Sequence, residues 1–149
     1  MAIDLGALPA PYLSFWRERH VCTLTTLRRD GTPHVVPVGV TYDPEERVAR
    51  VIASGTSRKV AHVLAAAGGG PAGARVAVCQ VAGRHWATLE GRATVSAEPA
   101  RVADAERRYA ERYGRNPREN PARVVIEIAV DRALGHVKEA VTTTARPAD

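Results

Sequence analysis

A short run of glycine, hydroxyl and cationic residues carries the clearest chemistry in the sequence. Residues 55–59 read GTSRK, and they stand between an apolar run and a segment in which Val60, Val63 and Leu64 recur at helical spacing. The start of a helix exposes backbone N–H groups, and neighbouring hydroxyls and cations add donors for a phosphate. The run therefore predicts an anion-binding site.

No set of residues indicates an acid, a base or a nucleophile, so the sequence assigns no catalytic residue. Ser57 has no neighbouring histidine with an acid to orient it, and glycine-rich nucleotide motifs are missing. Cys22 and Cys79 have no histidine or carboxylate pattern around them, which predicts reduced core thiols and no metal site. An enzyme of this kind usually leaves the difficult chemistry to a cofactor, and the anion-binding run would hold it.

The composition indicates a partner that is small and anionic. The 149 residues predict one domain over 1–149, and the net charge is +5 with a pI of about 9.8. The basic residues are dispersed and aromatic residues are few, which argues against nucleic acid. No apolar run reaches the roughly 20 residues of a membrane span. The N-terminus lacks the pattern of a signal peptide, so we expect a cytoplasmic protein.

The order of apolar runs and turn signals predicts a mainly β fold. Alternating runs predict six antiparallel strands over 20–28, 33–42, 47–54, 75–81, 85–96 and 123–131. Helical spacing predicts helices over 9–19, 57–67 and 99–113, the last with its arginines and glutamates facing solvent. Such a pattern is typical of a small antiparallel β-barrel flanked by helices.

The second of these strands contains Pro37, which cannot donate to a strand ladder and therefore indicates a bulge or a sheet edge. Gly39 follows two residues later. The backbone at this point is thus predicted to be open to a flat ligand.

Several segments together resemble a known superfamily. They read TLTTLRRDGTPHVVPVGVTYD, RVIASGTSRK, QVAGRHWATLEGRATVS and RYAERYGRNPRENPARVVIEI, within about residues 13–137. The sequence resembles the split β-barrel flavin and deazaflavin oxidoreductases, the superfamily of pyridoxamine-phosphate oxidase. Within it, the sequence is most similar to the actinobacterial branch that depends on coenzyme F420, which includes the F420H2-dependent biliverdin reductases.

The resemblance implies a split β-barrel that forms a homodimer, with two cofactor sites at the interface. It places the phosphate end of the cofactor at Ser54, Thr56, Ser57, Arg58 and Lys59. It places the ring along the backbone of Pro37, Val38 and Gly39, and it lets the second protomer contribute Gln80 and Trp86. The chain departs from close relatives by an insertion rich in alanine and glycine near 65–73.

The resemblance also implies an activity, namely hydride transfer from reduced F420 to biliverdin, which gives bilirubin. F420 carries a phosphate and an oligoglutamate tail, and biliverdin carries two propionates, so both ligands suit a basic protein. One alternative is an F420- or FMN-dependent reductase of quinones or other conjugated electrophiles. The other is a protein that binds a cofactor or a tetrapyrrole without turnover.

Overall fold

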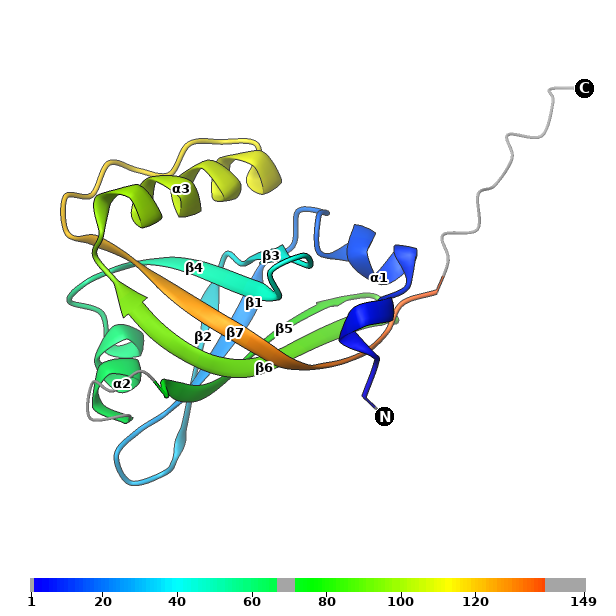
Figure 1. Cartoon of the computed structure of the whole chain (residues 1–149), viewed down its shortest axis with the longest axis horizontal. Coiled ribbons are helices and arrows are strands. Elements are labelled where there is room, and N and C mark those ends of the chain that lie inside the picture. Colours follow the sequence, from blue (N-terminus) through cyan, green and yellow to red (C-terminus); the bar gives the residue numbers. More distant parts are fainter. Residues whose placement is uncertain (1, 67–71, 139–149) are drawn as a thin grey trace, which may run out of the picture.

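Seven strands form one curved antiparallel sheet in the computed structural model, which describes residues 2–66 and 72–138 (Figure 1). The strands are β1 (Cys22–Leu27), β2 (Pro33–Val38), β3 (Thr41–Asp43), β4 (Val48–Ser54), β5 (Ala74–Ala82), β6 (His85–Ser96) and β7 (Arg123–His136). Their order is β2-β1-β5-β6-β7-β4-β3, so β2 and β3 are the two edges and the barrel stays open between them. The predicted split β-barrel is confirmed.

The predicted second strand is divided, which makes seven strands instead of six. The chain leaves β2 after Val38 and enters β3 at Thr41, at the opposite edge of the sheet. Two side chains of α3 (Pro99–Tyr113) bind Val40, which lies between β2 and β3. The N–H of Val40 donates to the Tyr113 hydroxyl at 3.1 Å, and its carbonyl accepts from Arg112 at 2.5 Å. Because Val40 bonds to these side chains, it is not free to continue the ladder.

The Tyr113 hydroxyl is a fixed part of this junction. Burial is the main cause that raises the pKa of Tyr113 to about 12, so the hydroxyl keeps its proton. It donates that proton to the carbonyl of His20 at 2.9 Å while it accepts from Val40. One side chain thus ties the break between β2 and β3 to the segment that precedes β1.

The helices flank the sheet as predicted. They are η1 (Leu5–Ala7), α1 (Ala10–Phe15), α2 (Arg58–Ala66) and α3. Helix α3 has the predicted bounds, because Pro99 suits a first turn and Gly114 ends the helix at a φ of 69°. Helix α1 is shorter than predicted, and part of the insertion near 65–73 lies outside the described residues.

The inward faces of the strands, closed by α1 and α2, form the main core. Its largest fully buried apolar side chains include Tyr12, Phe15, Leu24, Leu89, Ile126 and Ile128. Helix α3 lies on the outer side of β4 and β7 (Figure 1), where Val102 and Ala105 pack on Val125. Cys22 and Cys79 are both free; Cys22 is buried, whereas Cys79 is half-buried.

Arg112 corrects the prediction that the arginines of α3 face solvent. Arg112 is only 7% exposed. Its guanidinium donates to the carbonyls of Glu18 and Val40 and to the side-chain oxygen of Gln80. Arg112 lies on the same helix face as Val102 and Ala105, which the spacing of the three residues could have indicated. Its charge is solvated by carbonyl oxygens rather than by water.

Candidate functional site

The predicted anion-binding run forms the turn between β4 and α2. The Ser57 hydroxyl donates to the carbonyl of Ser54 at 2.8 Å. The Ser57 carbonyl accepts from the N–H of Ala61, and this is the first hydrogen bond of the helix. The hydroxyls of Ser54 and Thr56 lie 3.1 Å apart. The turn is therefore internally bonded, and its hydroxyls are gathered at the start of α2.

Two cations follow directly and remain available to a ligand. Arg58 is exposed and Lys59 is half-buried, and neither forms an ion pair with an acidic residue of the described chain. Most arginines of α3, by contrast, pair with carboxylates. Two uncompensated cations beside hydroxyls at a helix start form a donor set that fits a phosphate group.

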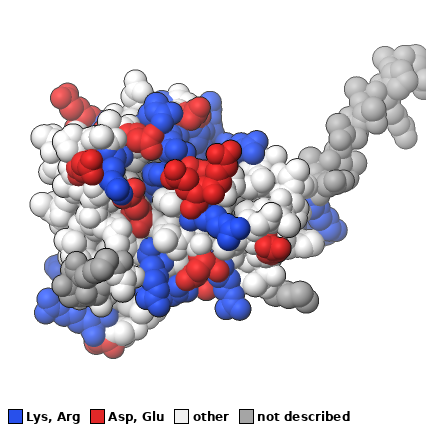
Figure 2. Space-filling view, in the orientation of Figure 1, with Lys and Arg blue, Asp and Glu red and all other residues white. Residues whose placement is uncertain are grey.

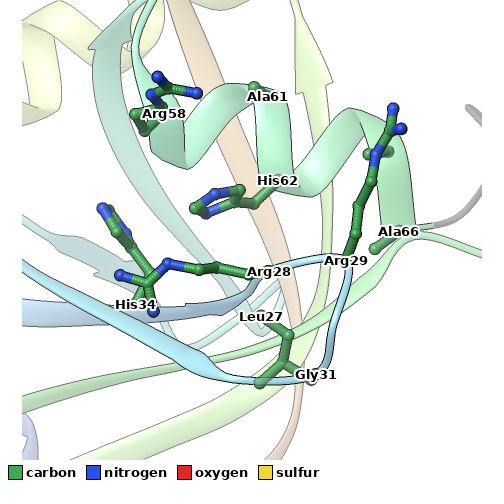
Figure 3. A pocket seen from close by; sticks show the side chains of 10 residues that line it. Leu27, Arg28, Arg29, Gly31, His34, Arg58, Ala61, His62 and Ala66 are labelled. Carbon is green, nitrogen blue, oxygen red and sulfur yellow. The ribbon is translucent and has the colours of Figure 1, made fainter.

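A pocket of about 880 Å³ opens between α2 and the β1–β2 hairpin; we call it the hairpin pocket (Figure 3). Its polar lining residues are all basic or imidazole side chains: Arg28, Arg29, His34, Arg58 and His62. Figure 3 shows Arg28, His34 and His62 directed into the space between the helix and the hairpin. Basic side chains also gather over this end of the molecule in Figure 2, whereas acids and bases alternate over the sheet beside α3.

The two histidines of the hairpin pocket are in contact with each other. Their rings lie 4.7 Å apart in a T-shaped arrangement, and His62 Nδ1 is 2.8 Å from the Thr26 hydroxyl. Burial, followed by the nearby His34, Arg28 and Arg58, lowers the pKa of His62 below its ordinary value. Nδ1 of His34 is buried and has no hydrogen-bond partner in the described part of the chain. An anion in this pocket would offset the surrounding positive charge.

The backbone predicted to accept the cofactor ring lies at an edge of the sheet. Pro37 pairs with Thr23 of β1, and β2 is an edge strand of the described sheet, as its proline indicated. Gly39, directly after the strand, lies against Tyr109 of α3: a Cβ on Gly39 would be 2.7 Å from Cε2 of that ring. Only glycine allows this close contact, so the opening inferred from Gly39 is partly filled by Tyr109.

A second pocket, of about 450 Å³, lies beside Gly39; we call it the loop pocket. Its lining includes Gly39, Ile52, Tyr109, Arg115, Pro117 and Arg118, together with Arg123 at the start of β7. Arg123 is paired in register with Ser54, and the N–H of Gly55 donates to the carbonyl of Ala122 at 2.8 Å. The loop pocket thus connects the backbone at Gly39 with the turn that carries the anion-binding run.

Within one chain, Gln80 and Trp86 do not lie at the loop pocket or at the anion-binding run. Gln80 is 1% exposed, its amide donates to the carbonyl of Phe15, and its oxygen accepts from Arg112. Trp86 is 40% exposed near the turn between β5 and β6, at the end of the sheet that carries α1, whereas α2 lies at the other end (Figure 1). Gln80 follows the inward alternation of Val76 and Val78, which explains its burial.

Sequence reasoning missed the hairpin pocket, the loop pocket and Arg112, since each is assembled from segments distant in the chain. Within residues 2–66 and 72–138, no three side chains of the types that bind metals lie together, and no helix is both long and apolar enough to cross a membrane. The chemistry this surface offers is anion binding next to an open strand edge.

Comparison with known proteins gives consistent results. A family model described as pyridoxamine 5'-phosphate oxidase matches residues 8–136. The chain is 50% identical over 123 residues to an F420H(2)-dependent biliverdin reductase of Mycobacterium tuberculosis (strain CDC 1551 / Oshkosh), covering 83% of this chain and 84% of that protein.

Solved structures share the fold at lower identity. An F420 reductase superposes with a TM-score of 0.66 and 21% identity over 85% of this chain and 98% of its own. A conserved hypothetical protein from Mycobacterium tuberculosis gives a TM-score of 0.69 and 20% identity, covering 88% of this chain and 85% of its own. At these identities the two structures support the fold alone.

Proposed function

The chain belongs to the pyridoxamine 5'-phosphate oxidase family, and from that premise we propose that it is an F420H2-dependent oxidoreductase that reduces biliverdin to bilirubin. The observation that carries this proposal is the 50% identity to a reductase of that name, over most of both chains. The free cations at the start of α2 support it, because they match the anionic character of this cofactor.

Two parts of this chain would hold the cofactor, the turn at the start of α2 and the end of β2. Arg58 and Lys59 would bind its phosphate with the hydroxyls of Ser54 and Thr56, and Ser57 would keep the turn in shape through its bond to Ser54. The backbone of Pro37, Val38 and Gly39 would lie along the ring. Bound F420H2 supplies the hydride for the central methine carbon of biliverdin.

The rest of the reaction depends on position and on a proton. Holding the donor and acceptor carbons in contact is the large effect a protein can contribute without acid, base or nucleophile. Among the residues that the structure describes, neither a carboxylate nor a histidine lines the loop pocket beside Gly39. We therefore assign the proton that reaches a bilin nitrogen to water, and no side chain of this chain is named as a catalytic acid.

A titration with F420 and, separately, with FMN tests the choice of cofactor. Intrinsic fluorescence of Trp16 and Trp86 reports binding in both cases. We expect F420 to bind more tightly than FMN, since its oligoglutamate tail adds anionic groups for the hairpin pocket. Tighter binding of FMN would overturn the assignment of F420 and favour a flavin reductase.

We also propose that residues 1–149 form one cofactor-binding domain that works in the cytoplasm. The single sheet and the one main core support the first point. The free thiols of Cys22 and Cys79 support the second, because reduced cysteines are typical of reducing compartments.

The homodimer is a further part of the proposal, and exposed apolar side chains support it. Val81 and Trp86 are paired in register, and Val21 lies opposite Val81 when the β1–β5 register is continued. Their exposed fractions are 65%, 40% and 73%. A row of apolar residues across β5, β6 and the start of β1 suits a self-complementary interface, and a partner's Trp86 would reach a cofactor site from there.

The substitution Val81→Glu tests the dimer. Placing a charge within the row should shift light scattering from the dimer mass to the monomer mass at micromolar concentration. Leu64→Glu is the matched control, since Leu64 on α2 is 50% exposed and lies outside the row; we expect it to remain dimeric. A wild-type protein that is monomeric with full affinity for F420 would refute the dimer proposal.

A further inference from the structure

The loop pocket has an apolar wall and a cationic rim. Ile52, Tyr109 and Pro117 provide apolar and aromatic surface, and Arg115 and Arg118 extend from the loop between α3 and β7. Both arginines are exposed, and neither pairs with an acidic residue in the part of the chain that the structure describes. Arg123, by contrast, is already neutralised by Glu106 at 3.0 Å.

The loop that carries the two arginines is fastened at both ends. At its start, Gly114 adopts the left-handed conformation and donates to the carbonyl of Ala110 at 2.9 Å. At its end, Asn120 accepts from the N–H groups of Ala122 and Arg123 at 2.9 and 3.1 Å. Pro117 restricts the backbone between them. The backbone of Arg115 and Arg118 is therefore held in place at the rim of the pocket.

We propose that the loop pocket is the acceptor-substrate subsite, in which Arg115 and Arg118 bind the two carboxylates of a conjugated dicarboxylate. This inference rests on the proposed function. The pocket contains Gly39, where the backbone assigned to the cofactor ring ends, so an acceptor stacked against that ring would have its edge in the pocket. The apolar wall suits a conjugated ring system, and the two unpaired guanidinium groups match two propionates in number and charge.

The charge of the substrate separates this role from a structural one. Biliverdin and its dimethyl ester share one conjugated skeleton, but only the free acid can form charge-assisted bonds with an arginine. Each Arg→Gln change should therefore weaken binding of biliverdin by about tenfold and leave the ester within about twofold. Removing both arginines should make the affinities for the acid and the ester nearly equal.

The experiment measures equilibrium binding by the absorbance change of the bilin, with wild type, Arg115→Gln, Arg118→Gln and the double variant. Arg92→Gln is the matched control, because Arg92 is an exposed arginine on β6 outside the pocket. We expect the control to bind both bilins like wild type, and all variants to bind F420 with unchanged affinity. The KM for biliverdin should rise in parallel with the Kd.

The contrary outcomes are distinct. Equal losses for acid and ester would show that the arginines shape the pocket rather than bind carboxylates, and lost affinity for F420 would give the pocket to the cofactor; either result overturns the inference. Unchanged biliverdin affinity in the double variant would overturn it as well, while the proposed function stands. A wild-type protein that binds neither bilin would refute the proposed function itself.

Discussion

The substitution Arg112→Met will lower the free energy of unfolding by about 2–4 kcal/mol, which corresponds to a fall in Tm of roughly 5–15 °C for a chain of this size. Arg112 is the donor for three acceptors: the buried carbonyl of Val40, the buried side-chain oxygen of Gln80 and the part-buried carbonyl of Glu18. Met keeps much of the length and the helix propensity of arginine but can donate to none of them. Unsatisfied buried acceptors cost about 1–3 kcal/mol each, and the total is reduced here because the Gln80 oxygen also accepts from the Cys22 thiol and the bond to Glu18 is only partly buried.

Arg107→Met is the control for this prediction. Arg107 lies on the same helix with its side chain 66% exposed, and within the described residues its one ion pair is with Asp104, so its loss should change stability by less than about 1 kcal/mol. Thermal and urea unfolding of both variants measure the difference. If Arg112→Met unfolds at the same temperature as Arg107→Met, the buried bonds of Arg112 are worth no more than a surface ion pair.

Lys59→Ala will weaken binding of F420 by about ten- to a hundredfold. A charge-assisted contact to a phosphate is typically worth about 1.5–3 kcal/mol, and each 1.4 kcal/mol is a factor of ten in affinity. Lys59 has no acidic partner among the described residues, so its charge is free for the ligand. The turnover rate at saturating F420 should fall much less, because the phosphate is remote from the reacting carbon.

Lys138→Ala provides the matched control, since Lys138 is the only other lysine and is exposed at the end of the described chain. It should bind F420 within about twofold of wild type. Titrations at two salt concentrations separate a specific contact from general attraction, because an exposed charge is screened more strongly. Equal affinities of wild type and Lys59→Ala at low salt would refute the phosphate assignment and favour Arg28 and Arg58 of the hairpin pocket.

Local patterns in the sequence predicted most of the fold. Helix α3 begins at Pro99 and ends before Gly114 because both signals lie within the segment itself. The division of the second strand was not predictable in this way, because Arg112 and Tyr113 hold Val40 from more than seventy residues away. A bulge at Glu90/Gly91 likewise allows β6 to pair with a β7 that extends to His136, beyond the predicted end at Asp131.

In the candidate site, too, features within one segment were predictable and features that join distant segments were not. The run at 55–59 is contiguous, so its residue types alone predicted an anion-binding turn. The hairpin pocket needs His34 and His62 in contact, and the loop pocket needs Gly39 beside Arg118; both depend on packing that no single segment encodes. Gln80 was predicted from resemblance to contact the cofactor, whereas its bonds to Phe15 and Arg112 place its amide in the interior.

Anaerobic turnover of biliverdin with F420H2 tests the central claim most directly. Catalytic amounts of the protein should convert biliverdin to bilirubin while one F420H2 is oxidised for each bilirubin formed, and reduced FMN should not replace F420H2. The contradicting result is that biliverdin stays unreduced with F420H2 while the protein binds the cofactor, or that reduced FMN supports the reaction at least as fast.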